Sequence, residues 1–338
     1  DLLEIEFFGQ LSDRKNVIKI LDDELAHVSS EQALDTIRKR NKRWNFQADI
    51  HLLEAITTPP EIMRFRSDVA SACLRHVTYL ALQDFAVRHG NIDANLEIIA
   101  LGRLATNSLT AQSDLDLIFV YDGCMEDVSD GRKPLGLSSY FIRLTQLITS
   151  WMSLKTKHGK LYELDLRLRP DGSAGPIALS SERFSSYYKK EAWIWEFFAL
   201  RDARTVLNGS EFSKHISANL KALRSQRIKY GELLSAFTEI QNRRKEETYH
   251  FWNLKQRHGG LLDCSIALYI IGNLGKEYPA ISNKLNQIQS RLEQLIQQLS
   301  TRLISYNSSI LPEQLIYFIA IQLGYDSDTL LKIQIEND

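Results

Sequence analysis

Two aspartates, Asp114 and Asp116, stand at the beginning of an apolar run of strand length, residues 115–121. The run is rich in β-branched and aromatic residues, which predicts a buried strand. Side chains alternate along a strand, so both carboxylates should lie on the same face where it begins. At about 5 Å and an effective dielectric constant of about 20, two carboxylates repel each other by roughly 3 kcal/mol. We therefore expect a divalent cation, magnesium, to bind here and to keep both aspartates ionised.

A second polar face is expected in residues 162–169, where apolar and charged residues alternate without a break. As a strand, this segment would place Glu163, Asp165, Arg167 and Arg169 on one face. Asp165 would then add a third carboxylate to the metal site, and could also act as a general base. Arg167 and Arg169 suit bidentate contact with phosphate oxygens, so we interpret them as a triphosphate clamp.

Each of these features has an ordinary explanation when taken alone. An Asp-x-Asp sequence at the start of a strand is common, and a strand with outward charges is usually only a solvated face. Exposed arginines pair with a neighbouring acid, here Glu163, more often than they bind a ligand. Only the combination indicates a site, whose candidate catalytic and metal-binding residues are Asp114, Asp116 and Asp165.

Other kinds of site are not indicated by the sequence. It has no Walker A motif and no GxGxxG motif, which argues against a P-loop NTPase and a Rossmann dinucleotide enzyme. The three cysteines lie far apart and the eight histidines do not cluster, so they do not predict a zinc site. The formal net charge is −1 and the basic residues are spread along the chain, which disfavours nucleic acid as a partner.

The composition is that of an ordinary globular protein, with 44% hydrophobic and 25% charged residues among 338. The longest apolar stretches are far shorter than the roughly 18 residues that indicate a membrane span. No signal peptide opens the sequence, so we expect a cytoplasmic protein without membrane contact. The sequence begins at Asp1 rather than methionine, and we expect it to be a piece of a longer polypeptide.

The periodicity predicts three regions and an α+β fold class. Residues 1–89 are expected to form a helical amino-terminal region. Residues 90–210 are expected to form the catalytic domain, with a mixed sheet and packed helices. Residues 211–338 are expected to form a carboxy-terminal helical bundle.

Several local signals support these regions. A capping box at residues 29–32 and a Thr58-Pro59 pair predict two helix starts. Strands are expected at residues 96–101 and 115–121, and a helix packed on the sheet at residues 137–154. An apolar stripe in the last region is interpreted as core rather than partner surface, and consists of Leu285, Ile288, Leu292, Leu295, Leu299 and Leu303.

Together these residues resemble the nucleotidyltransferase superfamily, in which a small turn is followed by Asp-x-Asp and by a later aspartate on a neighbouring strand. Residues 101–118 are similar to the first signature of the glutamine synthetase adenylyltransferase family, and residues 161–176 to its longer second signature. The resemblance implies a DNA polymerase beta-like fold, with ATP as substrate and Mg²⁺ as cofactor. It also implies nucleotide contacts from Gly102, Arg103, Thr106, Ser113, Arg167 and Arg169.

That family carries two similar catalytic halves, one that adds AMP to a tyrosine of glutamine synthetase and one that removes it by phosphorolysis. Residues 191–196 and 199–204 resemble the adding half, and the similarity extends through residues 252–255 and 259–263. The resemblance therefore implies transfer of AMP from Mg-ATP to a tyrosine of glutamine synthetase, with release of pyrophosphate, in the regulation of nitrogen assimilation. It implies as partners glutamine synthetase, a PII-type signal protein and the deadenylylating half.

Three residues, Ala105, Asn107 and Ser265, depart from the family pattern. Ala105 adds a Cβ where the backbone should approach a triphosphate closely, and Ser265 stands where the family has a glutamate. These departures leave open a catalytically weakened domain that is kept for regulation or binding. A nucleotidyltransferase that acts on a small hydroxyl acceptor, such as an antibiotic or a sugar, is the other alternative.

Overall fold

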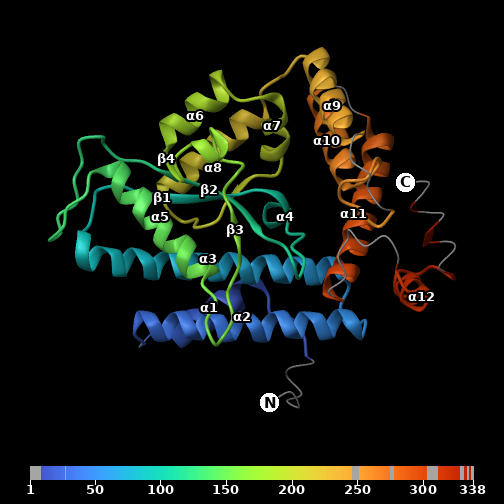
Figure 1. Cartoon of the computed structure of the whole chain (residues 1–338), viewed down its shortest axis with the longest axis horizontal. Coiled ribbons are helices and arrows are strands. Elements are labelled where there is room, and N and C mark those ends of the chain that lie inside the picture. The colour runs from blue at the N-terminus through green and yellow to red at the C-terminus, as the bar shows by residue number, and fades with distance from the viewer. Residues whose placement is uncertain are drawn as a thin grey trace. The chain divides into compact units, whose positions relative to one another are not determined.

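The computed structural model describes residues 9–26, 28–245, 251–274, 278–302, 311–327, 331–332 and 335 (Figure 1). Contacts group the chain into two compact units. The first unit comprises residues 1–50, 63–109 and 113–226, and the second comprises residues 51–62, 110–112 and 227–338. The three-region division with limits at residues 89 and 210 stays a prediction, because it follows the sequence pattern along the chain rather than contacts.

The chain begins with three helices, α1 (Arg14–Leu25), α2 (Ser30–Leu53) and α3 (Pro59–His89). Both predicted helix starts are confirmed. At α2, the Ser29 amide donates to the Gln32 side chain, and the Gln32 amide donates to the Ser29 hydroxyl. At α3, the amide and the hydroxyl of Thr58 both donate to Glu61 Oε2. These caps satisfy N–H groups that the first helical turn leaves without partners.

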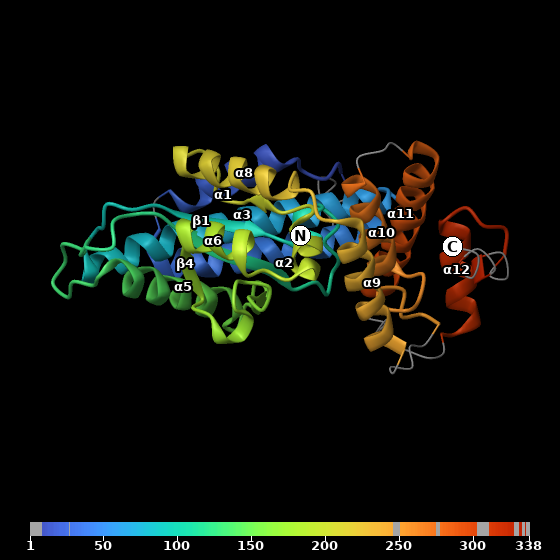
Figure 2. The ribbon, with the colours of Figure 1, turned by 90° about the horizontal axis from the view of Figure 1, so that it is seen from above.

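Arg66 holds α3 against α2 within the first unit. Its guanidinium donates to Asn45 Oδ1 and Asp49 Oδ1, each at 2.6 Å, and its side chain is 1% exposed. The two long helices therefore run side by side. The sheet lies between them and the helices that the first unit forms in residues 181–224 (Figure 1). In the view from above, the sheet lies over this helical layer (Figure 2).

A five-stranded mixed sheet belongs to the first unit, and its strands are β1 (Leu96–Ala100), β2 (Leu115–Tyr121), β3 (Leu164–Asp165), β4 (Ala178–Ser180) and β5 (Arg204–Thr205). β1 is antiparallel to β2 and to β5, whereas β3 and β4 are both parallel to β2. β3 pairs with the beginning of β2 and β4 with its end, so both share one edge of that strand. The predicted mixed α+β architecture and its two central strands are confirmed.

The first unit also contains the helices α4 (Gly102–Ala105), α5 (Leu137–Ser153), α6 (Ser181–Lys190), α7 (Ile194–Leu200) and α8 (Glu211–Arg224). α5 packs on β3 and β4, as predicted, through a buried face that includes Leu144, Ile148 and Met152. α6 contacts β2 and β4, while α8 contacts β1 and β5. A single-turn 3-10 helix (Gly172–Ala174) lies between β3 and β4.

The predicted strand over residues 162–169 is wrong in its length, because β3 stops at Asp165. The side chain of that aspartate ends the strand: its Oδ1 accepts the Arg167 amide N–H at 2.9 Å, which closes an Asx turn. The Arg169 amide then donates to the Leu166 carbonyl at 3.3 Å. The alternating charges after Asp165 therefore lie in a turn, and the two arginines do not share a strand face with it.

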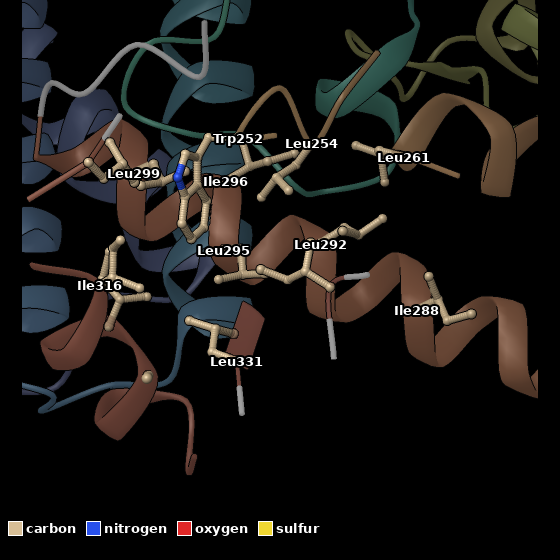
Figure 3. Packing of buried hydrophobic residues seen from close by; sticks show 14 of the residues in the cluster. Trp252, Leu254, Leu261, Ile288, Leu292, Leu295, Ile296, Leu299, Ile316 and Leu331 are labelled. Carbon is tan, nitrogen blue, oxygen red and sulfur yellow. The ribbon is translucent and has the colours of Figure 1, made fainter. Parts of the chain in front are cut away.

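The second unit contains the helices α9 (Tyr230–Lys245), α10 (Leu261–Asn273), α11 (Pro279–Thr301) and α12 (Glu313–Gln322). Apolar side chains of α10, α11 and α12 form one core with Trp252 and Leu254 (Figure 3). The predicted apolar stripe lies in α11 and is core, because Leu285 packs against this cluster and four further residues are buried in it, namely Ile288, Leu292, Leu295 and Leu299. Leu303 lies outside the described residues. Among the described helices, none is both long and apolar enough to cross a bilayer.

Candidate active site

The two motifs that contain the aspartates meet where β2 and β3 begin. The parallel register places Asp116 directly opposite Asp165. Asp114 precedes Asp116 by two residues, so the strand period directs both side chains to the same face. Asp114 is exposed, Asp116 is half-buried, and the Asp165 side chain is 17% exposed. The structure therefore brings the three predicted carboxylates to one solvent-accessible edge of the sheet.

The turn that follows β1 packs directly against Asp116. The Leu101 amide donates to the Asp116 carbonyl at 2.9 Å, and α4 begins at the next residue, Gly102. Gly102 has a φ of +51°, and a Cβ built on it would lie 2.3 Å from Asp116 Oδ2. Glycine is therefore required both by the left-handed backbone and by the position of the carboxylate. The predicted nucleotide contact at Gly102 thus lies beside the central aspartate.

Arg167 covers the carboxylate of Asp165. Its Nε lies 3.0 Å from each carboxylate oxygen, and its Nη2 lies 2.5 Å from Oδ2. Hydrogen bonding to Asp165, and then the charge of Asp165, raise the pKa of Arg167, and the charges of Asp116 and Asp114 raise it further. The Arg167 side chain is 80% exposed. A mostly solvated cation thus stands in the field of all three carboxylates.

The positions of the three carboxylates bear on the predicted magnesium site. Within the described residues, no group of three or more His, Cys, Asp or Glu side chains lies close enough together to hold a metal by itself. Magnesium is usually bound through one or two carboxylates together with substrate phosphates and water, rather than by a complete protein cage. The Asp116–Asp165 pair, with Asp114 on the same face, fits this pattern. The full set of three metal ligands stays a prediction.

Arg103, Thr106 and Ser113, the other predicted nucleotide contacts, lie in the segment between β1 and β2. Arg103 Nη1 donates to Ser113 Oγ at 3.4 Å, which joins the two ends of this segment. The Thr106 hydroxyl lies 3.3 Å from the Gly102 and Arg103 carbonyls. It lies 2.7 Å from the Ser108 hydroxyl. The Thr106 side chain therefore hydrogen-bonds within the turn that ends α4.

The unusual residues of this turn are accommodated by their surroundings. Ala105 is 7% exposed, so its Cβ packs inside the first unit. Asn107 has a φ of +56°, a left-handed conformation that asparagine adopts more readily than most residues. Arg204 of β5 supports the turn, since its Nη2 donates to the Leu104 carbonyl at 2.9 Å and to the Ser71 hydroxyl at 3.1 Å. Burial lowers the pKa of Arg204. Sequence reasoning missed this support, because the contact joins residues 100 positions apart.

Arg169 holds the loop that follows β3. Its guanidinium donates to four backbone carbonyls at distances of 2.6 to 3.4 Å, those of Leu166, Ser173, Gly175 and Pro176. The residue is 7% exposed, and burial lowers its pKa. Arg169 is therefore a supporting residue in this structure, whereas Arg167 is the arginine that reaches the carboxylates. Contact between Arg169 and phosphate stays a prediction.

A further arginine that the sequence did not single out, Arg183 of α6, ties the same loop to the segment before α7. Its Nη2 donates to Asp171 Oδ2 at 2.9 Å, and its guanidinium also pairs with Glu191. Glu196 fixes the following turn from inside the unit: it is buried and accepts the Trp193 amide N–H at 2.7 Å. Burial raises the pKa of Glu196. No pattern in the sequence pairs these residues, because the loop conformation brings them together.

Comparison with known proteins gives a consistent family assignment. The family model described as glutamate-ammonia ligase adenylyltransferase matches residues 1–219. A relative from Bradyrhizobium diazoefficiens is 35% identical over 276 residues, which is 80% of this chain and 28% of the relative. Relatives from Mesorhizobium japonicum and Bartonella quintana are 34% and 33% identical over 69% and 70% of this chain, and over 24% and 25% of their own lengths. All three are named bifunctional glutamine synthetase adenylyltransferase/adenylyl-removing enzyme. The chain spans about a quarter of the length of these relatives.

Proposed function

We propose that this chain, which belongs to the glutamate-ammonia ligase adenylyltransferase family, transfers AMP from ATP to a tyrosine hydroxyl of glutamine synthetase and releases pyrophosphate. The observation that carries the proposal is the register that pairs Asp116 with Asp165 at the start of two parallel strands, with Arg167 beside them. Similar carboxylate arrangements hold magnesium and a triphosphate in nucleotide-transferring enzymes. We further propose that the mixed sheet is a DNA polymerase beta-like nucleotidyltransferase fold.

Each residue of the site has a role in this reaction. Asp114, Asp116 and Asp165 would hold magnesium, which when bound lowers the pKa of an attacking hydroxyl and neutralises the triphosphate. The tyrosine oxygen forms a bond to the α-phosphorus while the bond to pyrophosphate breaks. Asp165 accepts the proton that the tyrosine loses. Arg167 leaves Asp165 and neutralises the charge that collects on pyrophosphate.

The turn at the start of α4 supplies the nucleotide contacts in this proposal. Gly102 brings the backbone next to Asp116 without a side chain between them. Arg103 adds a second positive charge, and its hydrogen bond to Ser113 holds it beside the strand that carries the aspartates. Thr106 contributes through the conformation of the turn. Arg169 would contribute by holding the loop that presents Asp165 and Arg167, and any direct contact with phosphate would be additional.

The direction of transfer and the partners are part of the same proposal. The relatives' names include both an adenylyltransferase and an adenylyl-removing activity. The likeness of residues 191–196 to the adding half supports adenylylation. Glutamine synthetase is then the protein substrate, and a PII-type signal protein and the deadenylylating half are the expected regulatory partners. Within this proposal, residues 90–210 form the catalytic domain and residues 211–338 its helical extension.

Transfer of label from α-labelled ATP to purified glutamine synthetase tests the proposal. The natural chain is compared with the double variant Asp114→Asn/Asp116→Asn, with magnesium present. Asp93→Asn is the matched control, because Asp93 is exposed in the segment before β1 and lies outside the site. We expect label on glutamine synthetase with the natural chain and the control, and at least a hundredfold less with the double variant.

Each other outcome identifies a different function. Binding of ATP without transfer of label would replace the proposal with a regulatory or docking domain. Label on a small hydroxyl compound instead of the protein would point to a different acceptor. Failure of the natural chain to bind Mg-ATP at millimolar concentrations would overturn nucleotidyl transfer altogether.

A further inference from the structure

We propose that a cavity at the opposite end of the sheet from the aspartates binds a small organic molecule that bears a phosphate group. The cavity is lined by residues of the last turns of α3, of the loop that follows β2, and of the exposed face of α5. Its volume is about 700 Å³, which is within the usual range for small-molecule sites. The strand pairing of Leu96 with Tyr121 places this end of the sheet at the far end of β2 from Asp116.

The charges around the cavity are mainly positive and come from three separate elements. Arg88 belongs to α3, Lys133 to the loop and Arg143 to α5. Asp84 is the one carboxylate among the lining residues that the structure describes. Within the described part of the chain, none of the three cations forms a salt bridge.

Several other arginines of the first unit have carboxylates or backbone carbonyls as partners. Arg66 pairs with Asp49, and Arg167 pairs with Asp165. A cation near the end of a helix also interacts favourably with the helix dipole, which accounts for Arg88. It does not account for Arg143, which lies in the middle of α5. The convergence of three exposed cations on one cavity favours an anionic ligand.

The wall of the cavity is held rigidly by backbone contacts. The Lys133 amide donates to the Arg88 carbonyl at 3.2 Å, and the Lys133 carbonyl lies 2.7 Å from Nδ1 of the buried His89. The Gly131 amide donates to the His89 carbonyl at 3.1 Å. A Cβ on Gly131 would lie 2.1 Å from the His89 carbonyl carbon, so the loop and α3 are in direct backbone contact. The cations are therefore carried by a preformed wall, which lowers the entropic cost of binding.

The rest of the lining indicates what the anion is attached to. Phe85, Pro134, Leu135 and Leu147 give the cavity an apolar part, which suits an organic group rather than a bare inorganic ion. Guanidinium groups can form paired hydrogen bonds with the oxygens of a phosphate. The ammonium group of a lysine adds a further positive charge, which favours a dianion. The ligand class is thus a phosphomonoester of a small organic molecule.

Isothermal titration calorimetry with phenyl phosphate tests this site. The probe combines a dianionic phosphate with an apolar ring. EDTA is included, because without metal the carboxylates of the active site repel an anion. Ionic strength is held constant. We expect saturable binding to the natural chain, weakened at least tenfold in Arg88→Gln/Arg143→Gln, a change of about 1.4 kcal/mol.

Arg132→Gln is the matched control, because Arg132 is exposed on the same loop and does not line the cavity. It should leave the affinity unchanged, while Lys133→Gln should weaken binding without altering the backbone contacts of the loop. Absence of saturable binding to the natural chain overturns the proposal, as does equal weakening by Arg132→Gln or undiminished binding by the double variant. In a separate titration without EDTA, binding that excess Mg-ATP displaces would place the probe in the proposed active site and would also overturn the proposal. Each outcome is independent of whether AMP is transferred to glutamine synthetase.

Discussion

Replacement of Arg169 by lysine would distinguish support of the loop after β3 from direct contact with phosphate. The substitution keeps the positive charge, but one ammonium group takes the place of a guanidinium that reaches four carbonyl groups. Asp165 and Arg167 lie at the beginning of the same loop. We therefore expect the free energy of unfolding and kcat for AMP transfer to fall together in Arg169→Lys.

The size of the effect follows from the hydrogen bonds. Nε and Nη2 of Arg169 each contact two carbonyl oxygens, and Nη1 contacts one at 2.6 Å. An ammonium group in the same space retains roughly two of these bonds, because its three N–H groups diverge from one atom. Hydrogen bonds to a charged group contribute about 1.5–3 kcal/mol each but are not additive at shared acceptors, so we expect a loss of about 2–4 kcal/mol. In Arg169→Met, which leaves every carbonyl without this donor, the expected loss is about 3–5 kcal/mol.

Urea unfolding and steady-state kinetics measure the two effects separately. Arg167→Lys is the matched control: its side chain is 80% exposed, so the free energy of unfolding should change by less than about 0.5 kcal/mol. Its KM for ATP should rise, because the proposed contact between the Arg167 guanidinium and phosphate is lost. The reasoning is refuted if Arg169→Lys unfolds like the natural chain and only its KM for ATP rises, since that result describes a direct phosphate ligand.

Three further substitutions have expected outcomes. Glu97→Ala should lower the free energy of unfolding in urea by about 3–5 kcal/mol, because the buried carboxylate accepts three backbone N–H groups of the turn after β5 and a serine hydroxyl; a loss below about 1 kcal/mol would contradict this role. Gly102→Ala should reduce AMP transfer at least tenfold, because its Cβ would displace Asp116, and unchanged kcat would exclude that displacement. Leu295→Ala should cost about 2–5 kcal/mol, since Leu295 is 0% exposed in the second unit's core; differential scanning calorimetry that shows no shift would refute this packing.

The features that the sequence predicted correctly have local signals. The helix starts at Ser29 and Thr58 are encoded in residues three positions apart, and their side chains form the expected caps. The strand after Asp114 is encoded by a run that is apolar at every position except Asp116, and these apolar positions are buried as expected. The stripe that contains Leu295 follows the helical period and is core. In each case the signal that predicts the structure lies in residues that are close together in the sequence.

Some features that the sequence did not predict arise because a side chain competes for a backbone N–H group. Others depend on contacts between residues that are far apart in the sequence. The alternation of apolar and charged residues predicted a strand through Arg169. The strand ends at Asp165, because the side chain of this residue accepts the backbone N–H of Arg167. β4 and β5 contain three and two residues, too few to show a period, and they exist because β2 and β1 offer free edges. Arg183 and Arg204 support the loops of the candidate site through contacts that no local pattern encodes.

The register of β3 against β2 brings the two motifs that contain the aspartates into one candidate site. In the observed register Asp116 faces Asp165, and the side chains of both point to the same side of the sheet. A slip of one residue would bring Leu164 or Leu166 opposite Asp116 and would turn Asp165 toward the core. Such a slip is unfavourable, because it would move the Asp165 carboxylate away from solvent and from Arg167. The register of the two-residue strand β3 thereby fixes the position of the aspartate that completes the carboxylate edge.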